Sequence, residues 1–204
     1  MPKASVHLPR IAPVAPIQRA QPFNDPAWLF EPKYDGFRGM VYLTRRSCTI
    51  LSKKQNVFSR FEELRRDICG EIPKVEAIID GEIVAIDEQG RVNFWDLMRG
   101  RGQLHYAAFD LLWLNGRDLR RLPLIERKRR LRRLIPRTTS TLSTVFTVPG
   151  RGCDLFEAAC QVDFEGIVAK QKAGKYDQRT RWWKIKNPTY TQAEGRRELF
   201  ERRS

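Results

Sequence analysis

Hydrophobic positions fall in short runs from residue 28 onward, and polar or turn-forming residues separate the runs. Most runs are rich in β-branched and aromatic residues, which fit the pleated surface of a strand. Asn115-Gly116 and Glu88-Gln89-Gly90 are typical of tight turns after two of these runs. The pattern predicts strands at residues 28–30, 37–43, 49–51, 77–86, 104–114, 144–148, 166–170 and 182–185.

Three further segments carry apolar residues at helical spacing, at residues 59–68, 123–135 and 154–162. In the first, Ser59 is followed three residues later by Glu62, the spacing of a capping box. The second begins with Pro123, which the first helical turn tolerates. Because hairpins and helices are mixed without a regular β-α-β alternation, we expect an α+β fold of mainly antiparallel sheets flanked by helices.

Composition sets the size and class of the protein. The chain has 204 residues, of which 41% are hydrophobic and 30% charged, as in a soluble globular domain. Six of its twelve prolines lie in residues 1–27, which predicts an extended arm. We therefore expect a Pro-rich arm (1–21), a globular domain (22–190) and a basic tail (191–204). No run of about 18 apolar residues is present, so we expect a cytoplasmic protein that does not enter membranes.

The side chains available restrict the chemistry. The four cysteines show no C-x-x-C spacing and there are only two histidines, so neither a zinc ribbon nor a histidine-based triad is indicated. Catalysis would then rest on lysine, arginine and carboxylates. The net charge of +14 comes mainly from arginine, whose forked guanidinium suits phosphate, so a nucleic acid is the favoured partner. Ten of the 21 residues from Arg117 to Arg137 are basic, and they form either a solvated helix face or a phosphate-binding surface.

The segment EPKYDGFR, residues 31–38, is the most informative for function. A strand is predicted to end at Pro32, which places Lys33 just beyond it, and Gly36 allows a tight reversal into the next strand. A lysine acts as a nucleophile only when its amine is neutral, which partial burial and nearby positive charges favour. We therefore expect other basic side chains close to Lys33.

Further chemical groups follow downstream in a fixed order. Glu82 and Glu165 lie at predicted strand ends, where two carboxylates could hold Mg²⁺. Lys184 and Lys186 are two apart on one strand, so both side chains face the same way and could meet a phosphate. Phe109 could stack on a base. Each residue alone could equally be structural, as a salt-bridge partner or part of the core.

Together, these motifs resemble the nucleotidyltransferase domain of ATP-dependent DNA ligases, and most closely the ligase domain of bacterial end-joining ligases. The resemblance runs from about Pro22 to Lys186. It implies an ATP-grasp-like fold, ATP and Mg²⁺ as cofactors, and nicked or broken double-stranded DNA as substrate. By this resemblance Lys33 is adenylylated, Glu31 lies against the adenine and Phe109 stacks on it. The resemblance also implies that Asp35 and Arg38 contact the lysine-proximal site and the ribose. Glu82 and Glu165 would serve the ribose and the metal, and Lys184 and Lys186 would touch the α-phosphate.

Two features depart from the family pattern. Lys53 belongs to the expected nucleotide site, but it stands where the family usually has an arginine beside the nick phosphate, and lysine lacks the forked geometry. Only 18 residues follow Lys186, too few for the oligonucleotide-binding (OB) barrel of the family. We therefore expect a lone catalytic domain without an OB barrel. Such a domain should be slow in self-adenylylation but less impaired in sealing a pre-adenylylated nick. An end-joining or OB-domain protein is a possible partner.

Other functions fit part of the same pattern. An RNA ligase or a capping guanylyltransferase uses the same lysine chemistry, and a non-catalytic nucleic-acid-binding module derived from a ligase would share the basic surface. A covalent AMP adduct on Lys33 separates the enzymes from the binding module. No heptad repeat is present, so we expect a monomer.

Overall fold

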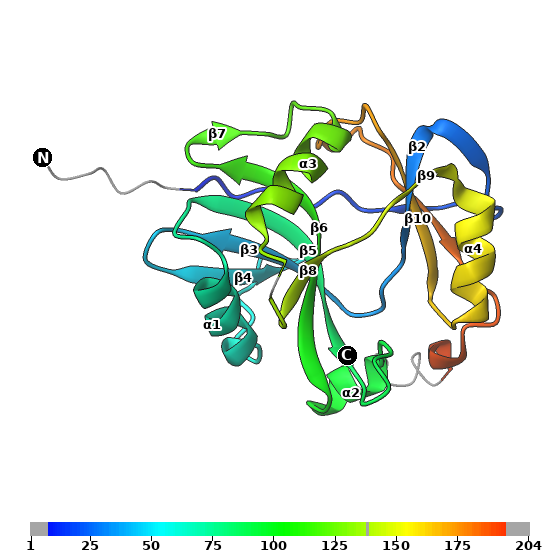
Figure 1. The fold of residues 1–204 in the computed structure, drawn as a ribbon, viewed down its shortest axis with the longest axis horizontal. Coiled ribbons are helices and arrows are strands. Elements are labelled where there is room, and N and C mark those ends of the chain that lie inside the picture. Colours follow the sequence, from blue (N-terminus) through cyan, green and yellow to red (C-terminus); the bar gives the residue numbers. More distant parts are fainter. Residues whose placement is uncertain (1–7, 138, 195–204) are drawn as a thin grey trace, which may run out of the picture.

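Two β-sheets face each other in the computed structural model, which describes residues 8–137 and 139–194 (Figure 1). The larger sheet has the order β4-β3-β5-β6-β7, and β8 also pairs with β6. Its strands are β3 (Phe37–Leu43), β4 (Cys48–Ser52), β5 (Ala77–Ile86), β6 (Gln103–Leu114), β7 (Arg117–Asp118) and β8 (Leu142–Thr144). The smaller sheet has the order β1-β11-β10-β2-β9. Its strands are β1 (Ile17–Gln18), β2 (Asn24–Pro32), β9 (Val148–Arg151), β10 (Gly166–Gln171) and β11 (Trp183–Lys186).

The strand pairings confirm the predicted α+β class with mainly antiparallel sheets. In the described part of the chain, β1–β11 and β6–β8 are the parallel pairs, and neither sheet closes into a barrel. The bounds of β3 and β5 are those predicted from the sequence. The strand predicted at 144–148 is wrong, because this stretch leaves the larger sheet at Thr144 and joins the smaller one at Val148.

Helices cover the outer faces of the two sheets. α1 (Glu62–Glu71) and α3 (Leu124–Leu134) pack on the larger sheet, and α4 (Gly152–Gln161) packs along β2 and β10 (Figure 1). α2 (Phe94–Arg99) was not predicted. None of the helices in residues 8–137 and 139–194 has both the length and the apolar character needed to cross a lipid bilayer.

The predicted capping box of α1 is wrong. The helix begins at Glu62 after Phe61, no side chain caps it, and Phe61 is buried in the core. Packing of this aromatic ring has thus determined where the helix starts, against the local capping preference. α3 matches its prediction, and its basic run divides into two faces: Arg127 and Lys128 are buried, whereas Arg129, Arg132 and Arg133 face solvent.

The Pro-rich segment before β2 packs between the sheets. It has no regular structure from residue 8 to residue 16, yet Ile11 and Val14 are only 2% exposed. They belong to a hydrophobic cluster with Met40, Tyr42 and other residues of both sheets. Their backbone amides donate to the hydroxyls of Tyr42 and Tyr176, at 3.0 and 3.2 Å. The segment therefore forms one wall of the space between the sheets.

Candidate active site

A pocket opens between the two sheets, and five of the predicted site residues line it. Each sheet contributes one wall, and Pro16 closes the side formed by the N-terminal segment. The lining residues are Pro16, Glu31, Pro32, Lys33, Tyr34, Arg38, Glu82, Phe109, Val145, Val168, Lys170 and Trp182.

Lys33 lies just after β2, as predicted, and faces this pocket. Its backbone amide donates to the carbonyl of Gly166 on β10, at 2.8 Å, so the main chain is fixed at this point. Its side chain is 20% exposed, and its Nζ forms an ion pair with Oε2 of Glu165. Lys33 is therefore held by its backbone and side chain, with its amine still accessible from the pocket.

Three further lysines gather near Lys33. Lys184 and Lys186 are two apart on β11, and Lys186 Nζ lies 3.7 Å from Oε1 of Glu165. Burial lowers the pKa of Lys184, and the positive charges of Lys186, Lys33 and Lys53 lower it further. Lys53 is exposed in the turn after β4 and does not line the pocket. The expected concentration of positive charge around Lys33 is present.

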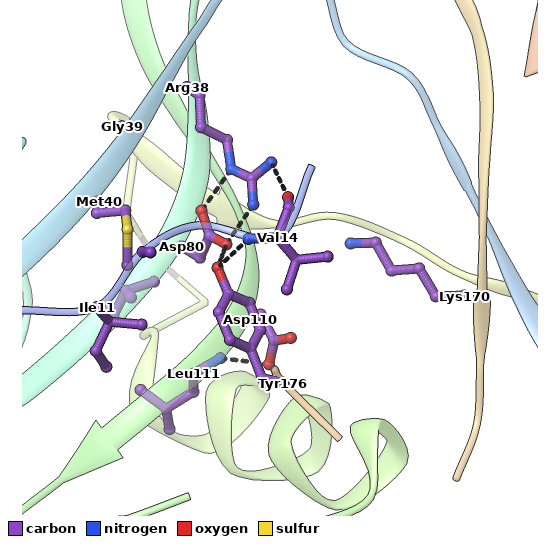
Figure 2. Close-up of polar contacts among 12 residues, drawn as sticks. Ile11, Val14, Arg38, Gly39, Met40, Asp80, Asp110, Leu111, Lys170 and Tyr176 are labelled. Atoms are coloured by element: carbon purple, nitrogen blue, oxygen red, sulfur yellow. Dashed lines mark hydrogen bonds and ion pairs between the residues drawn. The ribbon is translucent and has the colours of Figure 1, made fainter. Parts of the chain in front are cut away.

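Arg38 is fixed on the opposite wall by a buried carboxylate. Its Nε and one terminal nitrogen donate to the two oxygens of Asp80, at 2.7 and 2.6 Å, and its other terminal nitrogen donates to the carbonyl of Val14, at 3.1 Å (Figure 2). The Tyr176 hydroxyl also donates to Asp80, at 2.6 Å. Although burial opposes it, Asp80 raises the pKa of Arg38. The guanidinium is thus a permanent cation of fixed orientation.

Glu82 lies on β5 directly opposite Arg38 on β3. Burial raises the pKa of its carboxyl to about 7, while the charges of Lys33 and Arg38 oppose the shift. The charge of Lys33 therefore acts on the Glu82 carboxyl, although Glu82 and Lys33 belong to opposite walls of the pocket. Glu82 and Glu165, the two predicted metal ligands, therefore both interact with the charge of Lys33.

Phe109 forms part of the pocket wall beside two cations. The centroid of its ring lies 4.8 Å from Cζ of Arg38 and 4.1 Å from Nζ of Lys170, and the ring meets Trp182 edge to face at 6.0 Å. Phe109 is only partly buried. Its ring is therefore held in place while part of its surface remains accessible from the pocket.

Glu31 is buried between two lysines that sequence reasoning missed. Its carboxylate pairs with Nζ of Lys128 at 2.5 Å and with Nζ of Lys170 at 2.7 Å. Burial acts to raise the pKa of Glu31, but the two lysines overcome this and lower it. Burial also lowers the pKa of Lys170 to about 8. Lys170 follows Val168 by two residues on β10, so strand alternation could have identified it, whereas nothing separated Lys128 from the other basic residues of its run.

The position of Lys128 depends on a second buried ion pair. The neighbouring Arg127 donates through Nε and a terminal nitrogen to the two oxygens of Asp110 on β6, at 2.8 and 2.9 Å. Both side chains are fully buried. This pair fixes α3 on the larger sheet and thereby directs Lys128 toward Glu31.

Asp35 lies outside the pocket lining. Its carboxylate is buried and accepts a hydrogen bond from the hydroxyl of Tyr190, at 2.7 Å. Gly36 follows, and a Cβ atom there would lie 2.0 Å from the carbonyl oxygen of Ile83. Glycine is therefore required at this position because the chain passes so close to β5.

No group of three or more histidine, cysteine, aspartate or glutamate side chains in the described residues is arranged to hold a metal. Glu82 and Glu165 nevertheless offer two hard oxygen donors beside Lys33. Mg²⁺ typically binds one or two carboxylates and completes its shell with water and substrate phosphates. The residues present therefore fit Mg²⁺ that is bound together with a nucleotide.

Comparison with known proteins gives a consistent family. Residues 11–186 match the family described as "ATP dependent DNA ligase domain". The multifunctional non-homologous end joining protein LigD of Pseudomonas aeruginosa is 32% identical over 168 residues, which cover 78% of this chain and 20% of that protein. A DNA ligase of Pyrobaculum neutrophilum is 29% identical over 170 residues, covering 75% of this chain and 29% of the relative.

Solved structures agree with the sequence matches. The structure of mycobacterial DNA ligase D complexed with ATP and MES superposes with a TM-score of 0.72 and 26% identity, covering 86% of this chain and 60% of that one. The ligase domain of Mycobacterium tuberculosis LigD gives the same TM-score and identity over 86% and 59% of the two chains. The present chain spans about a fifth of the length of the curated LigD relatives, at 20%. Sequence, fold and pocket agree, and the chain belongs to the ATP-dependent DNA ligase domain family.

Proposed function

We propose that this chain catalyses ATP-dependent nucleotidyl transfer through Lys33 and passes the AMP to a DNA 5′-phosphate, leading to the sealing of nicked or broken double-stranded DNA. One observation carries the proposal: Lys33 Nζ contacts Glu165 at a pocket lined by Arg38, Glu82 and Phe109. A lysine on the surface of a simple binding module has no need of a fixed carboxylate and an aromatic wall.

In the proposed first step, the Lys33 amine attacks the α-phosphorus of ATP. Glu165 contacts Nζ and is positioned to accept the proton that the ammonium must lose before attack. A nitrogen–phosphorus bond then forms, the bond from the α-phosphorus to the bridging oxygen breaks, and pyrophosphate leaves with the electron pair. The product is a phosphoramidate between Lys33 and AMP.

The two walls of the pocket have different parts in this step. Phe109 supplies an aromatic surface for the base on the wall of the larger sheet, and Glu31 lies buried with its two lysines on the wall of the smaller sheet. Arg38 and Glu82 lie where the ribose would bind, whereas Lys184 and Lys186 supply positive charge for the α-phosphate. Lys53 extends this positive charge toward the surface, where a nick phosphate would approach.

Glu82 and Glu165 are the residues that would hold Mg²⁺. The ion, when bound, withdraws charge from the phosphate oxygens during transfer. Glu82 is suited to this part because its partly buried carboxyl has a pKa of about 7, so a nearby cation would favour its ionised form. Asp35 lies in the same loop as Lys33, and its side chain accepts a hydrogen bond from Tyr190. Asp35 therefore contributes to the site by fixing the loop that carries Lys33.

The remaining steps concern DNA. The 5′-phosphate of a nick attacks the phosphorus of the Lys33 adduct, so that the nitrogen–phosphorus bond breaks and the lysine is regenerated. The adjacent 3′-hydroxyl then attacks the activated 5′-phosphate and AMP leaves with the electron pair. The LigD relatives are named for non-homologous end joining, and the net charge of +14 of this chain suits a polyanionic substrate.

Mass spectrometry of the protein after incubation with ATP and Mg²⁺ tests the proposal. We expect a mass increase of about 329 Da on Lys33, which is the mass of a lysyl phosphoramidate of AMP. Lys33→Arg keeps the charge but should give no adduct. An adduct with GTP in place of ATP would indicate a capping activity, and the absence of any adduct in the wild-type protein would leave only a nucleic-acid-binding module. Sealing of matched pre-adenylylated DNA and RNA nicks then identifies the substrate.

A further inference from the structure

The segment that follows β11 returns to the loop that carries Lys33. The Tyr190 hydroxyl donates to Oδ2 of Asp35, at 2.7 Å, although the two residues are 155 positions apart in the sequence. Both side chains are buried, with exposures of 7% for Tyr190 and 5% for Asp35. A buried hydrogen bond to a carboxylate has a short, defined geometry, so it fixes the position of the loop relative to the C-terminal segment.

The same segment is attached to the smaller sheet. The backbone amide of Asn187 donates to the carbonyl of Glu165 at 3.0 Å, and its side-chain amide donates to the carbonyl of Phe164 at 3.1 Å. The amide and hydroxyl of Thr191 donate to the two oxygens of Asp163, at 3.0 and 2.5 Å. Asp163 follows α4, so these contacts hold Tyr190 against the wall that contributes Glu165 to the site.

Gln192 attaches the segment to the larger sheet. Its amide nitrogen donates to the carbonyl of Val92 at 3.0 Å, and its amide oxygen accepts from the backbone of Phe94 at 2.7 Å. Val92 lies between β5 and α2, and Phe94 is the first residue of α2, which packs against β5, the strand that carries Glu82. Residues 187–193 therefore span the two sheets, and we call them the C-terminal clasp; its last turn, η1 (Thr191–Ala193), lies near α4 and α2 in Figure 1.

The loop from Lys33 to Gly36 is confined from the other side as well. A Cβ atom at Gly36 would lie 2.0 Å from the carbonyl oxygen of Ile83, so the backbone of the loop packs directly against the backbone of β5. The Lys33 amide is bonded to Gly166 on β10. Between these two backbone attachments, the Asp35 side chain provides a third attachment, which comes from the clasp.

We infer that Tyr190 is a positioning residue for the Lys33 nucleophile. Through Asp35 it holds the 33–36 loop, and through the clasp it sets this loop relative to Glu165 on one sheet and Glu82 on the other. The inference rests on the proposed nucleotidyl transfer. In-line attack needs the amine within about 3–3.5 Å of the phosphorus and aligned with the leaving group, and misplacement by about 1 Å is enough to slow such reactions about 100-fold. Tyr190 lies outside the pocket lining, so its loss should affect alignment more than nucleotide binding.

Tyr190→Phe is the direct test because it removes the hydroxyl and retains the ring. The experiment measures the single-turnover rate of lysyl-AMP formation over a range of ATP concentrations, which separates the maximal rate from the ATP concentration at half-maximal rate. We expect the maximal rate to fall about tenfold or more, with the half-maximal concentration unchanged within about twofold. Thr189→Val is the matched control, since it removes a hydroxyl contact to Asn187 within the clasp that reaches neither sheet nor the Lys33 loop, and it should stay within about twofold of wild type in both quantities.

Gln192→Met provides a second variant if Tyr190→Phe does not fold. It removes both side-chain hydrogen bonds to the larger sheet at nearly constant length, and we expect a smaller fall in the maximal rate in the same direction. A Tyr190→Phe maximal rate within twofold of wild type would overturn the inference. So would equal losses in Tyr190→Phe and Thr189→Val, because these would indicate only general loosening. Failure of the wild-type protein to form any adduct would contradict the proposed function itself, and is therefore distinguishable.

Discussion

Arg38 lies directly opposite Glu82 in the pairing of β3 with β5, yet its close hydrogen bonds to a carboxylate go to Asp80. Asp80 is two residues earlier than Glu82 on the same strand and is fully buried. Among the described residues, Glu82 forms no ion pair, and burial raises the pKa of its carboxyl to about 7. On the same strand, the Asp80 carboxylate is therefore used to hold Arg38, whereas the Glu82 carboxylate faces the pocket and is available to a ligand.

Glu82→Gln should stabilise the protein, and more so at alkaline pH. The folded-state pKa of about 7 exceeds the ordinary value of 4.5, so between these values the folded protein keeps a proton that the unfolded chain releases. The protonated form of Glu82 therefore makes its full contribution to stability below pH 4.5. This contribution is lost as the pH rises through 7 and the partly buried site must accept the charged carboxylate. We expect the variant to gain about 2 kcal/mol in the free energy of unfolding at pH 8 and close to nothing at pH 4.5.

Urea unfolding at the two pH values measures this difference. Glu63→Gln, which changes an exposed carboxylate on α1, is the matched control and should leave the pH dependence of stability as in wild type. An equal gain for Glu82→Gln at both pH values would mean that burial does not disfavour the charged carboxylate. Because Glu82 is also a proposed magnesium and ribose ligand, the stabilised variant should be slower in forming the Lys33 adduct.

Arg38→Lys should destabilise the protein although the charge is retained. Lysine cannot form two parallel hydrogen bonds to Asp80 and also reach the carbonyl of Val14. Asp80 is fully buried, so a poorly matched partner leaves part of its charge uncompensated, and we expect a loss of about 2–3 kcal/mol. Arg91→Lys is the control: Arg91 pairs with Asp87 at the surface with its side chain 73% exposed, and the expected loss is below about 0.5 kcal/mol. Similar losses for both variants in urea unfolding would contradict the argument.

Much of the fold could be predicted from local pattern. β3 and β5 consist mainly of apolar residues with turn signals at their ends, and their bounds match the prediction. α2 was missed because six residues are too short for a helical period, although Asn93 accepts from the Asp96 amide at its start and Gly100 adopts a left-handed conformation at its end. The start of α1 could not be predicted from capping preferences because burial of Phe61 determines it.

The candidate site could be predicted only where the chemistry lies in one short segment. Lys33, Glu82 and Glu165 each stand in a recognisable motif, and the structure brings them together. The contacts that support them are long-range. Lys128 is one of many basic residues in its run, and nothing in the sequence indicates that it reaches Glu31. The contact of Tyr190 with Asp35 is likewise a consequence of the path of the chain after β11.

Phe109→Ala should weaken the use of ATP if the ring stacks on the base. Loss of base stacking on an aromatic side chain typically costs about 1–3 kcal/mol, so we expect the ATP concentration at half-maximal adduct formation to rise about tenfold. Phe109→Trp should retain most of the wild-type behaviour because it keeps an aromatic face. Phe146→Ala is the control, since Phe146 is 53% exposed and outside the pocket lining. An unchanged half-maximal concentration in Phe109→Ala would show that the ring serves only the core.

Glu31→Gln should destabilise the protein in a pH-dependent way. The change leaves Lys128 and Lys170, both buried, without the carboxylate that lies 2.5 and 2.7 Å from their amines. The two buried amines then face each other without the carboxylate that compensates them, and we expect a loss of about 3 kcal/mol at pH 6. The pKa of Lys170 is about 8 with Glu31 in place, and Glu31 acts to raise it, so in the variant Lys170 releases its proton at a lower pH than in wild type and the variant gains stability relative to wild type as the pH rises to 8. The loss should therefore be clearly smaller at pH 9. The double variant Glu31→Gln with Lys170→Met removes one cation and should recover part of the loss at pH 6 but little at pH 9. A loss that is equal at both pH values, with no recovery in the double variant, would show that repulsion between the lysines is not its cause.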